Sequence, residues 1–171
     1  VASMINMKGG VGKTTLTFNM AWYSAWRRNL RVLAIDLDPQ ANLSQYLMGA
    51  EAYLKFLNKQ NKTVVEIFEQ YSAPDRKTGS PVVINPDEMI HEFKDWNDDS
   101  CIHLVASSLE LACTLKNPTE KASLLPQFIA KIADRYDLIL IDCAPTESIL
   151  TTAAYLSSRY FFVPVKPEFL A

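Results

Sequence analysis

The chain has 171 residues, of which 49% are hydrophobic and 21% are charged, and this balance predicts one globular domain with a hydrophobic core. The formal net charge of −2 gives no overall reason to expect nucleic-acid binding. The sequence has no apolar run long enough to cross a bilayer and no secretory signal pattern, so we expect a cytoplasmic protein without membrane contact.

The cysteines and histidines predict no metal centre of their own. Cys101, Cys113 and Cys143 are odd in number, widely spaced and without a C-x-x-C pair. This pattern argues against a disulfide framework and against a zinc site built from protein ligands alone. We therefore expect buried, reduced thiols. His91 and His103 have no ligand set near them in the sequence.

The beginning of the chain predicts a strand, a helix and a second strand. Residues 1–7 are short, apolar and followed by glycines, which is typical of a buried strand. Residues 14–28 lack glycine and proline and end in Arg27 and Arg28, whose charges suit a helix C-terminus. Residues 31–37 are β-branched and apolar almost throughout. This order predicts a βαβ unit with parallel strands covered on both faces.

The middle of the chain is less regular, and residues 50–100 predict a helical insertion. Its turn-forming residues are concentrated in one proline-rich stretch. The expected segments are helices at 50–61, 63–71 and 87–96, a loop at 73–86 with a short strand at 82–84, and a turn at 97–100.

Regular alternation of strands and helices returns in the last part of the chain. The expected strands are 101–106, 137–142 and 159–165, and the expected helices are 122–135 and 148–158. The chain therefore predicts a single α/β domain over residues 1–171, with a doubly wound and mostly parallel sheet. Such sheets bind ligands at the carboxyl ends of their strands.

A phosphate-binding loop lies between the first strand and the first helix. The strict G-x-x-x-x-G-K-[ST] pattern fails at its first glycine, where Met7 stands, but its Gly-Lys-Thr end is intact. Glycines let backbone N–H groups converge on phosphate oxygens, and the following helix directs its positive end at the same anion. Lys13 supplies charge for the β- and γ-phosphates, and the Thr14 hydroxyl can ligate Mg²⁺. The expected cradle is Lys8, Gly9, Gly10, Val11, Gly12, Lys13, Thr14 and Thr15.

Three aspartates lie at the ends of predicted strands, at the same edge of the sheet. Asp142 ends an apolar strand, where a carboxylate suits Mg²⁺. Taken alone, it would be better explained as a helix-capping or turn residue before Pro145, but the nearby phosphate loop favours the metal role. Asp36 and Asp38 end the second strand and alternate onto one side, which suits metal positioning and orientation of an attacking water. Asp-Pro and Asn are also ordinary turn formers, so a turn remains the alternative for this segment.

Together these residues resemble the deviant Walker A ATPases, the ParA/MinD group of P-loop proteins. The segment from Lys8 to Thr15 matches the loop of this group residue for residue. Lys8 stands at the position of the lysine that reaches across a nucleotide-sandwich dimer in this group. The segment 38–42, Asp-Pro-Gln-Ala-Asn, is similar to the ParA partitioning branch. The resemblance implies the P-loop NTPase fold and a slow, switch-like hydrolysis of ATP.

The resemblance also implies residue roles and cofactors. Lys13 would act with Lys8 on the phosphates, and Asp38 would orient the hydrolytic water. Thr14, Asp36 and Asp142 would form or support the Mg²⁺ site. The implied cofactors are ATP and Mg²⁺, and the implied assembly is a homodimer formed on ATP binding.

The partners implied are a ParB-like adaptor and non-specific DNA, with nucleoid association in the cytoplasm. Both chain ends look trimmed, and we expect that the C-terminal helices of the group, with their base, dimer and DNA contacts, are missing.

A biosynthetic ligase of the cobyrinic acid a,c-diamide synthase or dethiobiotin synthetase type is the nearest rival hypothesis. An electron-transfer ATPase like the nitrogenase iron protein is a third reading, suggested by the three cysteines.

Overall fold

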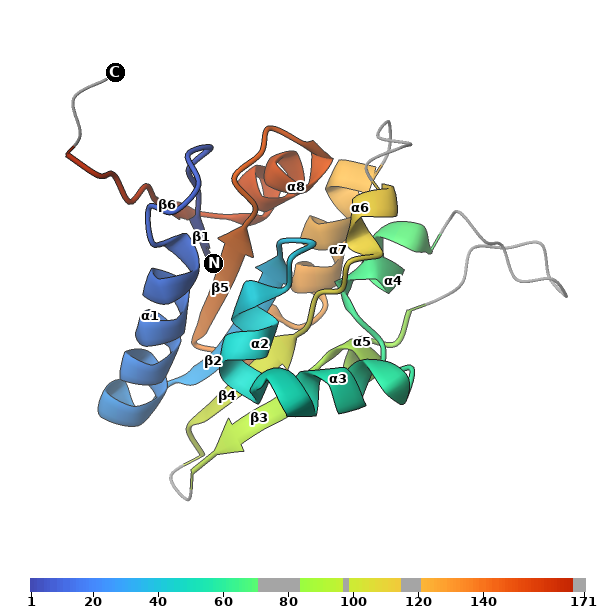
Figure 1. Cartoon of the computed structure of the whole chain (residues 1–171). Helices are drawn as coiled ribbons and strands as arrows, with labels where there is room; N and C mark the ends of the chain where they lie inside the picture. The colour runs from blue at the N-terminus through green and yellow to red at the C-terminus, as the bar shows by residue number, and fades with distance from the viewer. Residues whose placement is uncertain (71–83, 97–98, 115–120, 168–171) are drawn as a thin grey trace, which may run out of the picture.

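The computed structural model describes residues 1–70, 84–96, 99–114 and 121–167, and its centre is a six-stranded sheet (Figure 1). The strands lie in the order β3–β4–β2–β5–β1–β6, and every neighbouring pair is parallel except β3–β4. Their bounds are β1 Ala2–Met4, β2 Arg31–Leu37, β3 His91–Asp95, β4 Cys101–Val105, β5 Leu138–Cys143 and β6 Tyr160–Phe162. The predicted α/β fold with a mostly parallel sheet is confirmed.

Helices cover both faces of this sheet, as a doubly wound fold requires. Their bounds are α1 Lys13–Arg28, α2 Asn42–Met48, α3 Ala50–Asn58, α4 Val64–Glu69, α5 Pro86–Met89, α6 Leu111–Thr114, α7 Leu124–Ala130 and α8 Ile149–Ser157, with short 3₁₀ turns at Lys121–Ser123 and Ala133–Arg135. No helix among these described segments has the length and apolar character that a membrane span needs.

The central strand β2 supplies both hydrophobic cores. Val32 and Ala34 pack into the cluster that contains residues of α1 and α2. Leu33 and Ile35 pack into the cluster on the other face, which contains residues of α4, α7 and α8. All four side chains are fully buried. Because successive side chains of a strand point to opposite faces, an almost continuously apolar strand is what a sheet covered on both sides demands.

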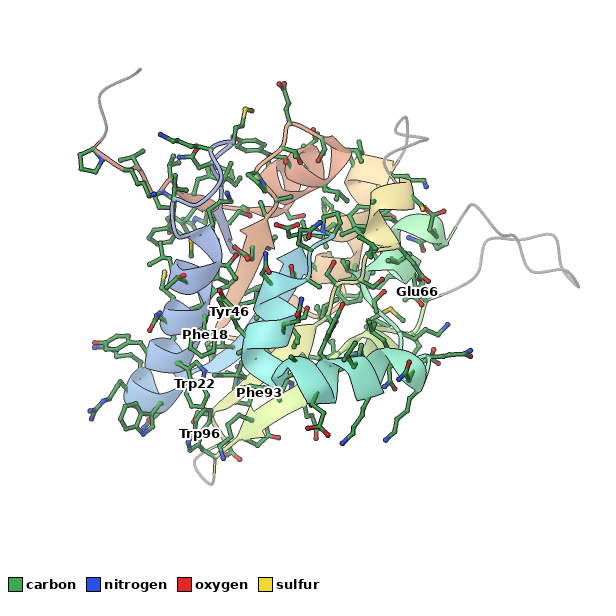
Figure 2. All side chains as sticks on the ribbon, in the orientation of Figure 1. Phe18, Trp22, Tyr46, Glu66, Phe93 and Trp96 are labelled. Carbon is green, nitrogen blue, oxygen red and sulfur yellow. The ribbon has the colours of Figure 1, made fainter. Side chains whose placement is uncertain are left out.

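An aromatic cluster lies where α1 meets α2 and β3 (Figure 2). The Trp22 ring packs edge-to-face on Phe93 and Trp96, with ring centroids 6.0 and 5.7 Å away. Phe18 lies between Trp22 at 6.2 Å and Tyr46 at 6.4 Å. Pairs at these separations stabilise a contact beyond the area they bury. The cluster therefore ties the first helix to the antiparallel edge of the sheet.

The prediction of a helix over residues 87–96 is wrong. The chain forms only the short α5 there, Ile90 is extended, and β3 follows as an antiparallel edge strand. Met89, Phe93 and Trp96 recur at helical spacing in the sequence, but Met89 packs into the core on one face of the sheet, and Phe93 and Trp96 pack into the core on the other face. The register of β3 against β4 shifts between Glu92 and Lys94, so the strand itself contains a bulge.

Other differences are smaller. Helix α1 begins one residue before its predicted start, and α2 and α6 were not expected. Of the strand expected at 82–84, residues 82 and 83 lie outside the described residues. Cys101 and Cys143 are buried thiols as expected, but Cys113 is exposed, because it lies on the outer side of the short helix α6.

Leu33 provides a test of the core. Leu33→Ala is expected to lower the free energy of unfolding by about 2–5 kcal/mol, because it deletes a fully buried side chain and leaves a cavity. Leu54 is 60% exposed, and Leu54→Ala should change the same quantity by no more than about 0.5 kcal/mol. Urea denaturation of both variants measures the difference, and equal costs would contradict this description of the core.

Candidate functional site

The candidate site lies where β1, β2 and β5 end. Asp36 and Met4 both stand opposite Asp142 in the strand register, so the loops after these three strands meet at one edge. A cavity of about 330 Å³ opens there. It is lined by Gly9, Gly10, Val11, Gly12, Lys13, Thr14, Thr15, Asp38, Asn42, Tyr46 and Pro145. The structure thus brings most of the expected loop together with Asp38.

The backbone of the loop depends on glycine at two positions. Gly10 has φ +69° and Gly12 has φ +91°, a region that side chains disfavour. Gly12 is also the N-cap residue of α1. The first N–H groups of a helix have no partner within the helix, and here this end lines the cavity. The loop and helix together form a positive concave surface suited to an anion.

The Lys13 ammonium is held at the base of the loop. Its Nζ donates to the carbonyl oxygens of Asn6 at 2.9 Å and Lys8 at 3.3 Å, and the side chain is buried. The Lys8 amide donates to Asn6 Oδ1 at 2.8 Å. Asn6 thereby fixes both lysines in one loop conformation. Lys8 itself is exposed, at the outer side of the loop.

Asp142 is buried beside α1 and carries an unsatisfied oxygen. Its Oδ1 accepts a hydrogen bond from the Thr17 hydroxyl at 3.1 Å, whereas Oδ2 is buried without a hydrogen-bond partner among the described residues. Burial raises the pKa of Asp142 to about 6, opposed by the hydroxyls of Thr14 and Thr17 and by the charge of Lys13. A hard cation that prefers oxygen ligands would satisfy Oδ2. Asp142 and Thr14 therefore fit a Mg²⁺ site.

Asp36 organises the loop that follows β2. Its Oδ1 accepts from the Asp38 amide at 3.1 Å, and its Oδ2 accepts from the amide and hydroxyl of Ser44 at 2.8 and 2.7 Å. Complete burial, followed by the nearby charge of Asp142, raises the pKa of Asp36 to about 7. Both oxygens already have donors, so the geometry favours a support role, and direct ligation by Asp36 stays a prediction.

Asp38 stands at the cavity on a tightly constrained turn. Its Oδ1 accepts from the Gln40 amide at 2.9 Å, and its carbonyl accepts from the Ala41 amide at 2.8 Å. Ala41 then adopts φ +52° immediately before α2. A left-handed conformation costs an L-residue about 1–2 kcal/mol, so surrounding contacts must enforce it. This turn combines the expected turn chemistry with a carboxylate that lines the site.

Several residues of the site were not expected from the sequence. Asn6, Ser44, Tyr46 and Pro145 carry no spacing signal, because their positions depend on contacts between distant segments. Thr17 could have been found, since it lies one helical turn after Thr14 and so shares its face of α1.

A phosphate loop between a strand and a helix on this kind of sheet defines the P-loop NTPase fold. The family model described as "AAA domain" matches residues 1–171. The chain belongs to this family and is a ParA/MinD-type P-loop ATPase.

The relatives include partition proteins and one biosynthetic enzyme. The chromosome-partitioning ATPase Soj of Treponema pallidum is 29% identical over 167 residues, covering 98% of this chain and 57% of Soj. A plasmid partition protein of Borrelia burgdorferi aligns with a TM-score of 0.76 and 26% identity over 98% of this chain and 66% of its own. Cobyrinic acid a,c-diamide synthase of Mycobacterium smegmatis, with bound ATP analogue and magnesium, aligns with a TM-score of 0.73 and 25% identity over 99% and 61%. The chain spans between 40% and 60% of the length of the curated relatives it matches.

The buried carboxylates predict an unusual pH dependence. The pKa of Asp36 rises from 3.8 to about 7 on folding. At a pH between these two values, Asp36 therefore holds a proton in the folded state that it has lost in the unfolded state. The free energy of unfolding should therefore fall as pH rises from about 4 to about 7, measured without nucleotide and Mg²⁺. Asp36→Asn should flatten this slope, whereas Asp134→Asn at the surface should leave it unchanged. Identical slopes in wild type and Asp36→Asn would contradict the assignment.

Proposed function

We propose that this protein is a ParA-type partition ATPase that binds ATP with Mg²⁺, hydrolyses it slowly and uses the nucleotide state as a switch. The observation that carries the proposal is the loop from Lys8 to Thr15, which combines the buried Lys13 with an exposed second lysine at Lys8. One lysine serves the site within the chain, and the other lies exposed at the outer side of the loop.

Phosphate binding follows from the loop and from α1. The backbone amides around Gly10 and Gly12 and the N-terminus of the helix surround the β- and γ-phosphates of ATP. Lys13 exchanges its carbonyl contacts for phosphate oxygens, which are stronger partners for an ammonium group because they carry charge. The cavity of about 330 Å³ accommodates the phosphate chain.

Thr14 and Asp142 would hold Mg²⁺, with Asp36 supporting them from behind. Mg²⁺ supplies neutralisation of phosphate charge when it is bound. Asp142 offers its unsatisfied Oδ2, and the Thr17 hydroxyl orients the carboxylate through Oδ1. Burial favours the protonated form of Asp142, and a bound cation would lower the pKa of this carboxyl group again, which links metal binding to its charge state.

Asp38 orients the attacking water, and Lys8 completes the site of a partner subunit. The Asp38 carboxylate lines the same cavity as the phosphate loop, on a turn fixed by Asp36. In a dimer with ATP between the subunits, Lys8 adds positive charge to the partner's phosphates. Loss of the γ-phosphate removes this attraction, so hydrolysis weakens the dimer.

The partners proposed are DNA and a ParB-like adaptor, in the cytoplasm and on the nucleoid. Soj and the Borrelia relative are partition proteins by name, which supports this role. The net charge of −2 means that DNA affinity needs a local basic surface rather than the overall charge of this chain.

A biosynthetic ligase of the cobyrinic acid a,c-diamide synthase type is the alternative, because a solved enzyme of this kind shares the fold. Lys8 and the segment 38–42 favour the partition ATPase. ATP-dependent turnover of a cobyrinic acid substrate by the protein would support the ligase instead.

The two lysines have separable effects. Lys13→Ala should weaken ATP binding by about 10- to 100-fold, because a charge-assisted contact contributes about 1.5–3 kcal/mol. Lys8→Ala should bind ATP normally and fail to dimerise. Fluorescent-nucleotide titration measures the first effect and light scattering with ATP measures the second. Equal ATP-dependent dimerisation of wild type and Lys8→Ala would exclude the role of Lys8 in the partner's site.

Asp38→Ala should retain ATP binding and lower turnover by about 100-fold or more, the contribution typical of a group that activates water. The ATP-bound dimer should accumulate. Phosphate release and light scattering measure the two effects, with the surface variant Asp134→Ala as a control. Unchanged turnover in Asp38→Ala would reject Asp38 as the residue that orients water.

A further inference from the structure

A second cluster of ligand-type side chains lies at the opposite end of the sheet, where β4 begins. Asp95, Cys101 and His103 each offer one ligand atom, and these atoms all lie within 4.8 Å of one another. Cys101 is buried, the His103 side chain is 20% exposed and that of Asp95 is 55% exposed. His103, for which no ligand set was expected, therefore has two ligand-type neighbours: Cys101 on the same strand β4, and Asp95 on the neighbouring strand β3.

The strand register explains why these residues converge. Cys101 and His103 are two residues apart on β4, so their side chains share one face of the sheet. Asp95 pairs with Cys101, and Glu92 pairs with His103. Asp95 and Glu92 are three residues apart, a spacing that would place them on opposite faces of a regular strand. The bulge at Phe93 returns both carboxylates to the face of Cys101 and His103.

The imidazole of His103 is held at both nitrogens. Nε2 lies 3.1 Å from Asp95 Oδ1, and Nδ1 lies 2.8 Å from the hydroxyl oxygen of Tyr136. The rings of His103 and Tyr136 also pack edge-to-face, with centroids 5.6 Å apart. Histidines that bind metals characteristically use their second nitrogen for such an outer contact. Nε2 is thereby directed at the space shared with Asp95 and Cys101.

The cluster borders a cavity of about 640 Å³ that gives a solvated ion access to it. Two arginines, Arg31 and Arg135, also line this cavity. Arg31 donates to both oxygens of Asp137, at 3.1 and 2.9 Å, and Arg135 pairs with Asp87. Each arginine charge is thus balanced by its own carboxylate, so repulsion of a cation at the cluster is reduced.

We propose that Asp95, Cys101 and His103 form a zinc-binding site that joins the edge strand β3 to β4. A thiolate, an imidazole and a carboxylate are ligands that Zn²⁺ accepts, and three protein ligands leave a fourth position for water. Binding forms the Zn–S bond with release of the Cys101 thiol proton to solvent. The imidazole gives up the Nε2 proton that it shares with Asp95 and takes one at Nδ1 from solvent, where it donates to the Tyr136 hydroxyl oxygen, so that Nε2 and the Asp95 carboxylate each bond to the metal. No electron is transferred. The site is separate from the proposed nucleotide site.

Zn²⁺ titration of the full chain, followed by calorimetry and by competition with a chromogenic chelator, tests the proposal. One Zn²⁺ should bind per chain, and Co²⁺ in its place should give a thiolate-to-metal absorption band. Cys101→Ser and His103→Gln should abolish this binding. Cys113→Ser removes an exposed thiol elsewhere on the chain and should bind Zn²⁺ like wild type. Circular dichroism checks that each variant is folded.

Two milder variants keep the test decisive if Cys101→Ser does not fold. Asp95→Asn changes a half-exposed carboxylate and should lower Zn²⁺ affinity while leaving the fold intact. Tyr136→Phe removes the outer contact of His103 and should lower affinity by about 10-fold or more, the effect typical of such partners. The proposal is overturned if wild type binds no stoichiometric Zn²⁺, or if Asp95→Asn and His103→Gln both bind it as tightly as wild type.

Discussion

The structure depends on two carboxylates buried side by side at the centre of the sheet. Asp36 and Asp142 stand opposite each other on β2 and β5, and both are fully buried. Two such groups repel each other and lose hydration, so a fold that keeps them must supply hydrogen-bond donors or a cation. Ser44 supplies donors to Asp36, and Thr17 supplies one to Asp142. The N-terminal halves of α1 and α2 are thereby fixed against the sheet.

This constraint connects the chemistry of the site with its architecture. Ser44 also accepts a hydrogen bond from the Ser107 amide at 3.0 Å, so Asp36 reaches the loop after β4 through a single hydroxyl. The same aspartate holds the Asp38 amide. Asp36 therefore connects the surroundings of Asp142 to the turn that carries Asp38. Burying charged groups where a reaction needs them generally costs stability relative to apolar packing.

The sequence was sufficient to predict the fold class and the phosphate loop, because both rest on local patterns. The loop from Gly10 to Thr14 and the apolar run of β2 can each be recognised from a few consecutive residues. The sequence was not sufficient where a residue's position depends on pairing between segments that are distant along the chain. Residues 91–95 look helical until the bulge against β4 is known, and Asp95, Cys101 and His103 look unrelated for the same reason. Ser44 and Thr17 are ordinary hydroxyl residues until their buried partners are seen.

The aromatic cluster gives the molecule an optical property of its own. Tyr46 lines the phosphate-loop cavity, its ring contacts Phe18, and Phe18 contacts Trp22. Trp22 is largely enclosed by Phe93 and Trp96, whereas Trp26 is 56% exposed on the same helix. The indole emission of Trp22 thus arises two ring contacts from the cavity, in surroundings different from those of Trp26. The intrinsic fluorescence of the protein is therefore sensitive to the packing of α1 against α2, and no added label is needed to follow it.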